Sequence, residues 1–363
     1  MFNIPTYIKS LSDIFTKNNK ELYLVGGCVR DFLLNIIPKD FDVCTNSLPL
    51  ETVEFLSNEG YKINLRGSKF GVIVAHRKDL PKDGIEIATF RKDISTGRHP
   101  EVKVGVSIDD DVSRRDLTIN ALYINIKDGL LVDSVDGVSD LNNRIIRMVG
   151  EPKQRILEDQ LRVLRTVRFA TRFNFKIEEV TSNSIIEYSD LTDISNERTY
   201  DEILKSYNQC DFYKYLKLSD SLGLLNKMFV GLKINTDIRK CNNLSVYISN
   251  LLIDNNPKDI DVILTQKLKF DRTTANRIKF LMELSKLDEN NVYYLYKQKS
   301  ILRILDNTIL ELGKVLDIDF SNFINYNPIH NIDELNKEGF TGKKLGDKIT
   351  EIETENWRNI CQK

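Results

Sequence analysis

The chain has 363 residues, which is enough for two or three domains with a substantial core. Its 52 basic and 53 acidic residues give a formal net charge of −1, which excludes a general electrostatic attraction to nucleic acid. Any RNA binding must therefore come from a local basic stripe. The five cysteines are odd in number and lack a C-x-x-C pair, and no stretch is apolar enough to span a membrane. We expect a reduced, cytoplasmic protein that contacts no membrane and holds no structural zinc.

A short strand followed by paired glycines opens the most informative part of the sequence. Leu22–Val25 is typical of a buried strand, and Gly26 and Gly27 let the backbone turn sharply and approach a ligand closely. Cys28–Leu34 is predicted to be a helix, and the free N–H groups at its start suit a phosphate. Asn35 is predicted to end that helix in the left-handed conformation. The segment therefore predicts a phosphate-binding turn.

Two acidic residues follow this turn at a spacing that suits a metal ion. Asp40 and Asp42 are two apart, and residues two apart on an extended strand share one face. Two carboxylates beside a phosphate-binding turn make a site for Mg²⁺ and a nucleoside triphosphate. Either pattern alone is usually a surface turn, but together, at strand–turn–helix–strand spacing, they favour the functional interpretation.

Short β-rich runs alternate with helical patterns up to about residue 133. The predicted strands are Leu22–Val25, Asp40–Cys44, Phe70–Ala75, Gly84–Thr89 and Ala121–Ile126. This mixture predicts a compact α/β head. Glu86 would face away from its apolar neighbours on its strand, where its carboxylate could contribute to a site on that face. An edge-strand glutamate facing water is the alternative.

A second cluster of charged residues precedes the last predicted strand of the head. Arg114, Arg115 and Asp116 stand just before an apolar stretch that includes Asn120. An isolated Arg-Arg-Asp is usually a solvated capping turn. Here the arginines have a ready role, because a guanidinium is the natural bidentate partner for the phosphate oxygens that the first motif requires.

From about residue 155 helical periodicity dominates. Residues 158–170 are predicted to form one helix, on which Asp159 and Arg162 share a face. The alternative for this pair is a solvated salt bridge of little energetic weight. Arg165, Arg168 and Arg172 fall in the same broad stripe as Arg162, where some could meet the phosphates of an RNA. The rest of the chain is predicted to be helical, with an exposed Gly- and Lys-containing segment around Lys343 and Lys344.

These motifs together resemble the class II tRNA nucleotidyltransferases, the CCA-adding and poly(A) polymerase branch of the polymerase-β-like superfamily. The resemblance rests on Gly-Gly-x-Val-Arg-Asp at residues 26–31, Asp-x-Asp at 40–42, Arg-Arg-Asp-Leu-Thr-x-Asn-Ala at 114–121 and Glu-Asp-x-x-Arg at 158–162. It implies an α/β nucleotidyltransferase (polymerase-β-like) head followed by an all-α neck, body and tail. The expected boundaries are 1–135 for the head, 136–205 for the neck and 206–363 for the body and tail.

The resemblance also implies a role for each candidate residue. Asp40 and Asp42 would hold Mg²⁺, and Glu86 would complete the catalytic carboxylates. The implied nucleotide-binding residues are Gly26, Gly27, Arg30, Arg114, Arg115, Asp116, Asn120, Asp159, Arg162, Arg165 and Arg168. Arg172, Lys343 and Lys344 would contact RNA, and the loop 91–100 would support addition of A.

The implied base selection has a simple chemical basis. The carboxylate of Asp159 would accept a hydrogen bond from the exocyclic amine of cytosine or adenine, and the guanidinium of Arg162 would donate to the ring acceptor beside it. Guanine and uracil present a carbonyl where cytosine and adenine present an amine, so neither fits. Two side chains would thus replace a nucleic-acid template.

The function implied is template-independent addition of C, C and A to the 3′ end of tRNA, from CTP and ATP with release of pyrophosphate. A poly(A) polymerase or an A-adding-only enzyme of the same family is the nearest alternative. A catalytically idle RNA-binding protein would not need the intact carboxylates. A small-molecule nucleotidyltransferase would not need the Asp159 and Arg162 pair or a long helical body.

Overall fold

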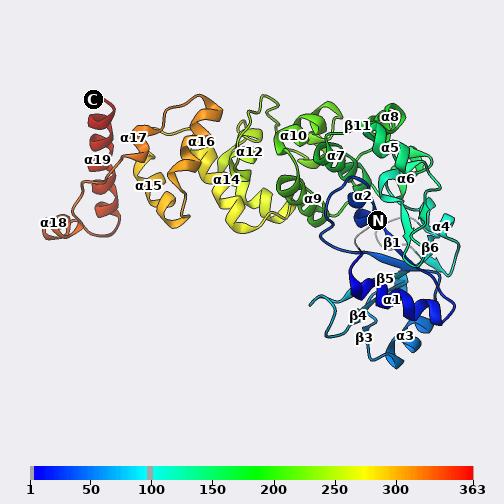
Figure 1. The fold of residues 1–363 in the computed structure, drawn as a ribbon. Helices are drawn as coiled ribbons and strands as arrows, with labels where there is room; N and C mark the ends of the chain where they lie inside the picture. The colour runs from blue at the N-terminus through cyan, green and yellow to red at the C-terminus, as the bar shows by residue number, and fades with distance from the viewer. Residues whose placement is uncertain (1–3, 96–100, 363) are drawn as a thin grey trace. The chain divides into compact units, whose positions relative to one another are not determined.

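The computed structural model describes residues 4–95 and 101–362, which fall into two compact units (Figure 1). The first unit spans Met1–Ile194 and the second Ser195–Lys363. The boundary between them lies inside the segment predicted as the neck. The three-part division at residues 135 and 205 stays a prediction.

The first unit is built on one mixed sheet with the strand order β3-β4-β5-β2-β1-β8-β9. Neighbouring strands are antiparallel except β2 and β5, which are parallel. A short antiparallel pair, β6 and β7, and a parallel pair, β10 and β11, stand apart from it. The strands are β1 (Leu22–Val25), β2 (Val43–Thr45), β3 (Lys62–Asn64), β4 (Val72–His76), β5 (Ile85–Thr89), β6 (Arg91–Asp93), β7 (Val102–Val104), β8 (Tyr123–Asn125), β9 (Leu131–Val132), β10 (Ile145–Ile146) and β11 (Lys176–Ile177).

Helices of the first unit pack against this sheet and continue beyond it. Phe15 of α1 and Phe55 of α3 meet edge to face with ring centres 4.9 Å apart, which joins the two helices. The helices are α1 (Thr6–Lys17), α2 (Gly27–Leu33), α3 (Pro49–Asn58), α4 (Ile108–Ser113), α5 (Gly137–Asn143), α6 (Pro152–Glu158), α7 (Leu161–Phe173) and α8 (Glu179–Tyr188), with 3₁₀ turns η1 (Ser68–Phe70) and η2 (Thr118–Asn120).

An aromatic cluster forms the centre of the head core. The rings of Tyr23, Phe90 and Tyr123 contact one another, with centre separations of 5.6, 6.5 and 6.2 Å. All three are buried and pack with Val25, Cys44 and Val112. Because these residues come from β1, β2, β8 and α4, the cluster fixes the strand ends that carry the first two motifs.

The head follows the sequence prediction closely at its strands. β1 has the predicted bounds, and Asn35 has φ 56°, which confirms the left-handed stop. β2 is shorter than predicted, since it begins at Val43, so Asp40 and Asp42 precede the strand. The single helix predicted over 158–170 is wrong: Asp159 is extended, with φ −155° and ψ 103°, and separates α6 from α7.

The second unit is helical throughout its described residues (195–362). Its helices are α9 (Asn196–Gln209), α10 (Phe212–Ser221), α11 (Leu225–Met228), α12 (Leu244–Leu251), α13 (Pro257–Val262), α14 (Arg272–Leu284), α15 (Val292–Ile301), α16 (Asp306–Leu316), α17 (Ser321–Ile324), α18 (Ile332–Lys337) and α19 (Gly342–Cys361), with a π-helical turn η3 (Ile263–Lys267). None of the described helices of the chain is long and apolar enough to cross a membrane.

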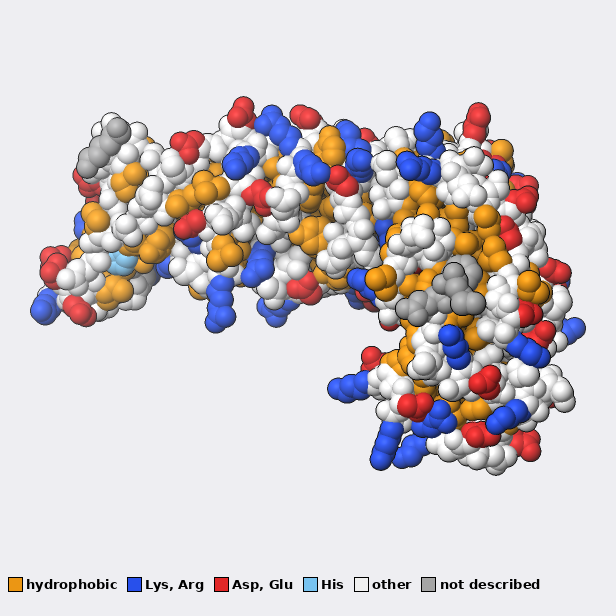
Figure 2. Space-filling model, viewed as in Figure 1, with side chains coloured by type: hydrophobic (Ala, Val, Ile, Leu, Met, Phe, Trp, Pro, Cys, Tyr) orange, Lys and Arg blue, Asp and Glu red, His pale blue; other side chains and the backbone are white. Residues whose placement is uncertain are grey.

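Charges on the second unit are mixed. On the face shown in Figure 2, basic side chains over this unit alternate with acidic ones. Lys343 and Lys344 lie exposed in the first turn of α19. Their predicted contact with RNA stays a prediction.

Candidate active site

The Gly-Gly turn lies where β1 ends and α2 begins. Gly26 has φ 71° and ψ −121°, a conformation that only glycine adopts readily, and its N–H donates to the Leu122 carbonyl at 3.1 Å. A side chain at Gly26 would come within 3.5 Å of Nη1 of Arg115. The structure thus brings an arginine of the second motif against the turn of the first.

Asp40 and Asp42 lie at the same edge of the sheet as this turn. The Asp42 carbonyl accepts from the Val25 N–H at 3.1 Å, immediately before Gly26. Between the two aspartates, the Phe41 ring packs on Phe32 of α2, with ring centres 5.9 Å apart. The side chain between the two carboxylates is therefore used for packing, and both aspartates are exposed.

Glu86 lies one strand away from Asp42. In the parallel pair β2–β5, Val43 stands opposite Ile87, so Asp42 and Glu86 occupy the positions just before them. Desolvation by the surrounding protein atoms raises the pKa of Asp42, the negative charges of Glu86 and Asp40 raise it further, and Arg115 opposes them. The Asp42 carboxylate is therefore repelled by two neighbouring negative charges.

The donor set at this edge suits a hard divalent cation, but it is not a closed cage. Carboxylate oxygens are the ligands that Mg²⁺ prefers, and a cation would relieve the repulsion at Asp42. Within residues 4–95 and 101–362, no three His, Cys, Asp or Glu side chains lie close enough together to hold a metal ion. The carboxylates therefore fit a divalent cation that takes only a few of its ligands from the protein.

Residues of the Gly-Gly-x-Val-Arg-Asp motif, of the Arg-Arg-Asp motif and of helix α7 meet in one largely buried hydrogen-bond network. Arg30 donates to Asp31 Oδ1 at 2.9 and 2.6 Å and to Asn120 Oδ1 at 2.5 Å. The Asn120 amide donates to Asp116 at 3.3 Å. Asp116 accepts from both Nε and Nη2 of Arg165, at 2.7 and 2.6 Å. The network thus joins α2, the turn η2 and the neck helix α7.

The Asp116–Arg165 pair predicts a pH-dependent contribution to stability. Burial alone would raise the pKa of Asp116, but Arg165 and two further hydrogen-bond donors, the Leu117 N–H and the Asn120 amide, lower it to about 2. Because its pKa is depressed on folding, Asp116 stabilises the protein above its unfolded pKa of about 3.9, and this contribution is lost as the pH falls toward 2. Asp116→Asn should therefore cost about 2–3 kcal/mol at pH 7 in urea unfolding, and less at pH 3. A cost that does not depend on pH would contradict this assignment.

The rings of two phenylalanines on α7 contact the guanidinium groups of four arginines. Phe169 and Phe173 stack with their planes 3° apart, and the Arg30 guanidinium lies 5.1 and 4.8 Å from their ring centres. Arg165 and Arg168 lie 5.5 and 4.4 Å from the Phe169 ring. Arg172 lies 5.0 Å from the Phe173 ring, and 3.8 Å from Asp31.

Acidic side chains balance part of this positive charge, because Arg165 pairs with Asp116 and Arg172 lies beside Asp31. Phe169 and Phe173 are the apolar support of these arginines. The contacts of Arg168 and Arg172 with nucleotide or RNA stay predictions.

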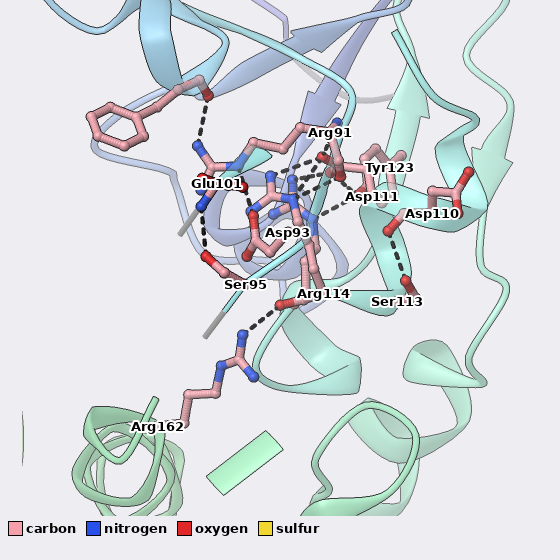
Figure 3. Close-up of polar contacts among 12 residues, drawn as sticks. Arg91, Asp93, Ser95, Glu101, Asp110, Asp111, Ser113, Arg114, Tyr123 and Arg162 are labelled. Carbon is pink, nitrogen blue, oxygen red and sulfur yellow. Dashed lines mark hydrogen bonds and ion pairs between the residues drawn. The ribbon is translucent and has the colours of Figure 1, made fainter. Parts of the chain in front are cut away.

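The predicted base-reading pair lies at the junction of α6 and α7. Asp159 Oδ1 accepts from the Leu161 N–H at 3.1 Å, and the Arg162 N–H donates to the Asp159 carbonyl at 3.0 Å. The Arg162 guanidinium donates to Glu158 at 2.6 Å and to the Arg155 carbonyl at 3.1 Å. It also donates to the Arg114 carbonyl at 2.8 Å (Figure 3). The surface salt bridge weighed as the alternative is not what the structure contains, because Arg162 is 9% exposed and is tied to the head.

Sequence reasoning missed two acidic residues that hold these arginines. Asp111 is 1% exposed and binds both Arg114 and Arg115, and Glu158 binds both Arg155 and Arg162. Each acid stands three or four residues from its arginines, a spacing that the sequence displays openly. The spacing alone does not separate such buried pairs from solvated ones.

The structure does not place every predicted residue in a cavity. A hollow of about 590 Å³ is lined by Lys92, Arg114, Arg155 and Glu158, among others, but not by the aspartates of the first motif. Asp40 and Asp42 are solvent-exposed. Of the predicted loop 91–100, residues 96–100 lie outside the described part of the chain, and β6 and β7 flank them.

The chain matches two families of known domains. The Poly A polymerase head domain matches residues 22–147, and the probable RNA and SrmB-binding site of polymerase A matches residues 174–234. The first match covers the Gly-Gly turn, the carboxylates and the Arg-Arg-Asp motif.

Known proteins agree with these matches. The mitochondrial CCA tRNA nucleotidyltransferase 1 of Mus musculus is 31% identical over 312 residues, which cover 83% of this chain and 68% of that protein. Poly(A) polymerase I of Haemophilus influenzae is 34% identical over 229 residues, covering 58% of this chain and 48% of that protein. A crystal structure of the Bacillus stearothermophilus CCA-adding enzyme in complex with CTP has the same fold, with a TM-score of 0.67, 21% identity and coverage of 97% and 91%. The chain therefore belongs to the family of nucleotidyltransferases that comprises the CCA tRNA nucleotidyltransferases and the poly(A) polymerases.

Proposed function

We propose that this chain is a template-independent CCA-adding enzyme, which adds C, C and A to the 3′ end of tRNA from CTP and ATP. The observation that carries the proposal is the network in which Arg30, Asp116 and Arg165 join the Gly-Gly and Arg-Arg-Asp motifs to helix α7. It sets a neck helix beside the Gly-Gly turn, as a site that reads a base and holds its triphosphate requires.

The roles of the side chains follow from their positions. Arg115 lies against the Gly26 turn, so it holds triphosphate oxygens together with the backbone N–H groups there. The primer 3′-oxygen forms a bond to the α-phosphorus, the bond from that phosphorus to the β-phosphate oxygen breaks, and pyrophosphate leaves. The head thus orients the phosphates while the neck holds the base.

Mg²⁺ belongs to this proposal as the cofactor, held by Asp40 and Asp42. When bound, it neutralises charge on the triphosphate and promotes loss of the primer hydroxyl proton. Glu86 supports the site through its position beside Asp42 on the neighbouring strand. Glu86 as a third catalytic carboxylate remains part of the proposal.

Base selection falls to Asp159 and Arg162. To read a base, the Arg162 guanidinium has to exchange one of its bonds, to Glu158, to the Arg155 carbonyl or to the Arg114 carbonyl, for one to the incoming nucleotide. Binding of the nucleotide is the natural trigger for this exchange.

We further propose a cytoplasmic location. All five cysteines are free, which fits a reducing compartment. The mitochondrial relatives show that members of the family also work in another such compartment.

The decisive experiment supplies one nucleotide at a time to tRNA shortened by one, two or three terminal residues. CTP alone should extend the shortest substrate by two residues, and ATP alone should extend only tRNA ending in CC. Incorporation of A alone would identify an A-adding enzyme, and long A tails on unrelated RNA would identify a poly(A) polymerase. Either result would overturn the proposal.

A further inference from the structure

Asp111, within α4, is a buried carboxylate of the head with hydrogen-bond donors on both oxygens. It is 1% exposed, and donors surround both of its oxygens (Figure 3). Oδ1 accepts from Nε and Nη2 of Arg114, at 3.0 and 2.8 Å, and from the Arg91 backbone N–H at 3.1 Å. Oδ2 accepts from Arg115 Nη2 at 3.0 Å and from the Tyr123 hydroxyl at 2.6 Å.

The partners of Asp111 lead to different parts of the site. Arg115 reaches the Gly26 turn, and its Nε also donates to the Tyr123 hydroxyl at 2.6 Å. Arg114 donates to the Arg91 carbonyl at 3.1 Å and offers its own carbonyl to Arg162. Arg91 begins β6, which leads into the loop. The Asp111 carboxylate is thus bonded to Arg115, which reaches the Gly26 turn, and to Arg114, whose carbonyl contacts Arg162. It is also bonded to Arg91, where the loop 91–100 begins.

The geometry holds the two guanidiniums as a pair. Side by side, two arginines repel each other and would otherwise point apart toward solvent. Burial alone would raise the pKa of Asp111, but Arg115 and Arg114 lower it, so the carboxylate stays ionised between them. With Nε and Nη2 of Arg115 both used, its Nη1 is the group left facing Gly26.

We propose that Asp111 is a positioning residue that fixes Arg115 and Arg114 in the orientation that receives the nucleoside triphosphate. The inference rests on the proposed function, because it takes the triphosphate to bind at the Gly26 turn. Asp111 does not touch the nucleotide itself, and it acts through the two arginines.

The sign of the change in nucleotide affinity distinguishes a positioning role of Asp111 from a purely electrostatic one. A buried negative charge beside the arginines weakens their attraction for phosphate, so its removal alone would tighten nucleotide binding. Loss of orientation has the opposite sign, because a flexible arginine must be ordered again when the ligand binds. In Asp111→Asn, the amide nitrogen would face the donors of Arg115 and Tyr123, or those of Arg114 and Arg91. One of the two arginines therefore loses its acceptor in either case.

The experiment measures equilibrium binding of CTP and of ATP, without tRNA, to the full chain and to three variants. Asp111→Asn should weaken binding of both nucleotides by about tenfold, and should raise KM for both more than it lowers kcat. Asp110→Asn is the matched control, because Asp110 precedes it on α4 but pairs only with Ser107 and Lys92 on the outer face. It should bind both nucleotides as the unaltered protein does.

Tyr123→Phe keeps the inference testable if Asp111→Asn does not fold. It removes one donor to Asp111 and the acceptor for Arg115 Nε, and it should weaken binding in the same direction by a smaller factor. Binding in Asp111→Asn that equals the Asp110→Asn control, or exceeds it, would overturn the inference. No binding by the unaltered protein would instead overturn the proposed function.

Discussion

Asp42→Asn is expected to abolish addition of both C and A while tRNA binding remains. The substitution keeps the size of the side chain but removes the charge that would hold Mg²⁺. The substitution should affect metal binding and not RNA binding, so incorporation of C and incorporation of A should be lost together. The measurement is single-nucleotide incorporation beside a tRNA gel-shift assay, and near-normal turnover would contradict the assignment of Asp42.

The same variant gives a readout that does not depend on activity. Glu86 and Asp40 repel the Asp42 carboxylate, so Asp42→Asn should raise the melting temperature in the presence of a chelator. Adding Mg²⁺ should stabilise the unaltered protein, since a ligand that binds the folded state stabilises it. The variant should gain much less from Mg²⁺. An equal gain in both proteins would place the metal elsewhere.

Glu86→Gln separates the third carboxylate from the other two. If Glu86 is a ligand, the variant should lose most of its turnover, as Asp42→Asn does. If it only faces water beside Asp42, turnover should fall mildly, and the main assignment would stand without that role.

The parts of the head that the sequence predicted are those fixed by short-range chemistry. β1, the Gly-Gly turn and the stop at Asn35 depend on residues within one or two turns of each other, and the structure has them where the pattern places them. The family resemblance added the roles, because each motif is short and its spacing is distinctive.

The structural features that the sequence did not predict depend on contacts between segments that are distant along the chain. The break at Asp159 carries no proline or glycine, and it is stabilised by Arg162 reaching back to the Arg114 carbonyl, 48 residues away. Asp111 differs from Asp109 and Asp110 only in which way its side chain points. The Asp111 side chain points toward Tyr123 on β8, and a local sequence pattern contains no information on that contact.

Arg162→Ala is expected to weaken the preference for CTP and ATP over GTP and UTP, as well as slowing both additions. A reader in a desolvated pocket loses about 1–3 kcal/mol when one hydrogen-bond partner is removed, which is about five- to 150-fold in selectivity. Asp159→Ala should lower selectivity likewise. Single-nucleotide incorporation with each of the four nucleoside triphosphates measures this directly.

The difficulty with Arg162 is that it also holds the neck to the head, so a loss of activity by itself proves little. Arg155 provides the matched control. Like Arg162 it is buried, it donates to the other oxygen of Glu158, and it bonds a head carbonyl, that of Ser113, one residue before Arg114. Arg155→Ala should therefore lower stability to a similar degree.

The ratio among the four nucleotides distinguishes the two arginines, because instability lowers every rate by the same factor and cancels from the ratio. Selectivity should be unchanged in Arg155→Ala and reduced in Arg162→Ala. If both variants keep the preference for C and A, then Arg162 serves only to join neck and head, and base selection must lie with other residues. If both lose it, the geometry of the whole α6–α7 junction sets the choice of base, and the guanidinium of Arg162 is one part of that geometry.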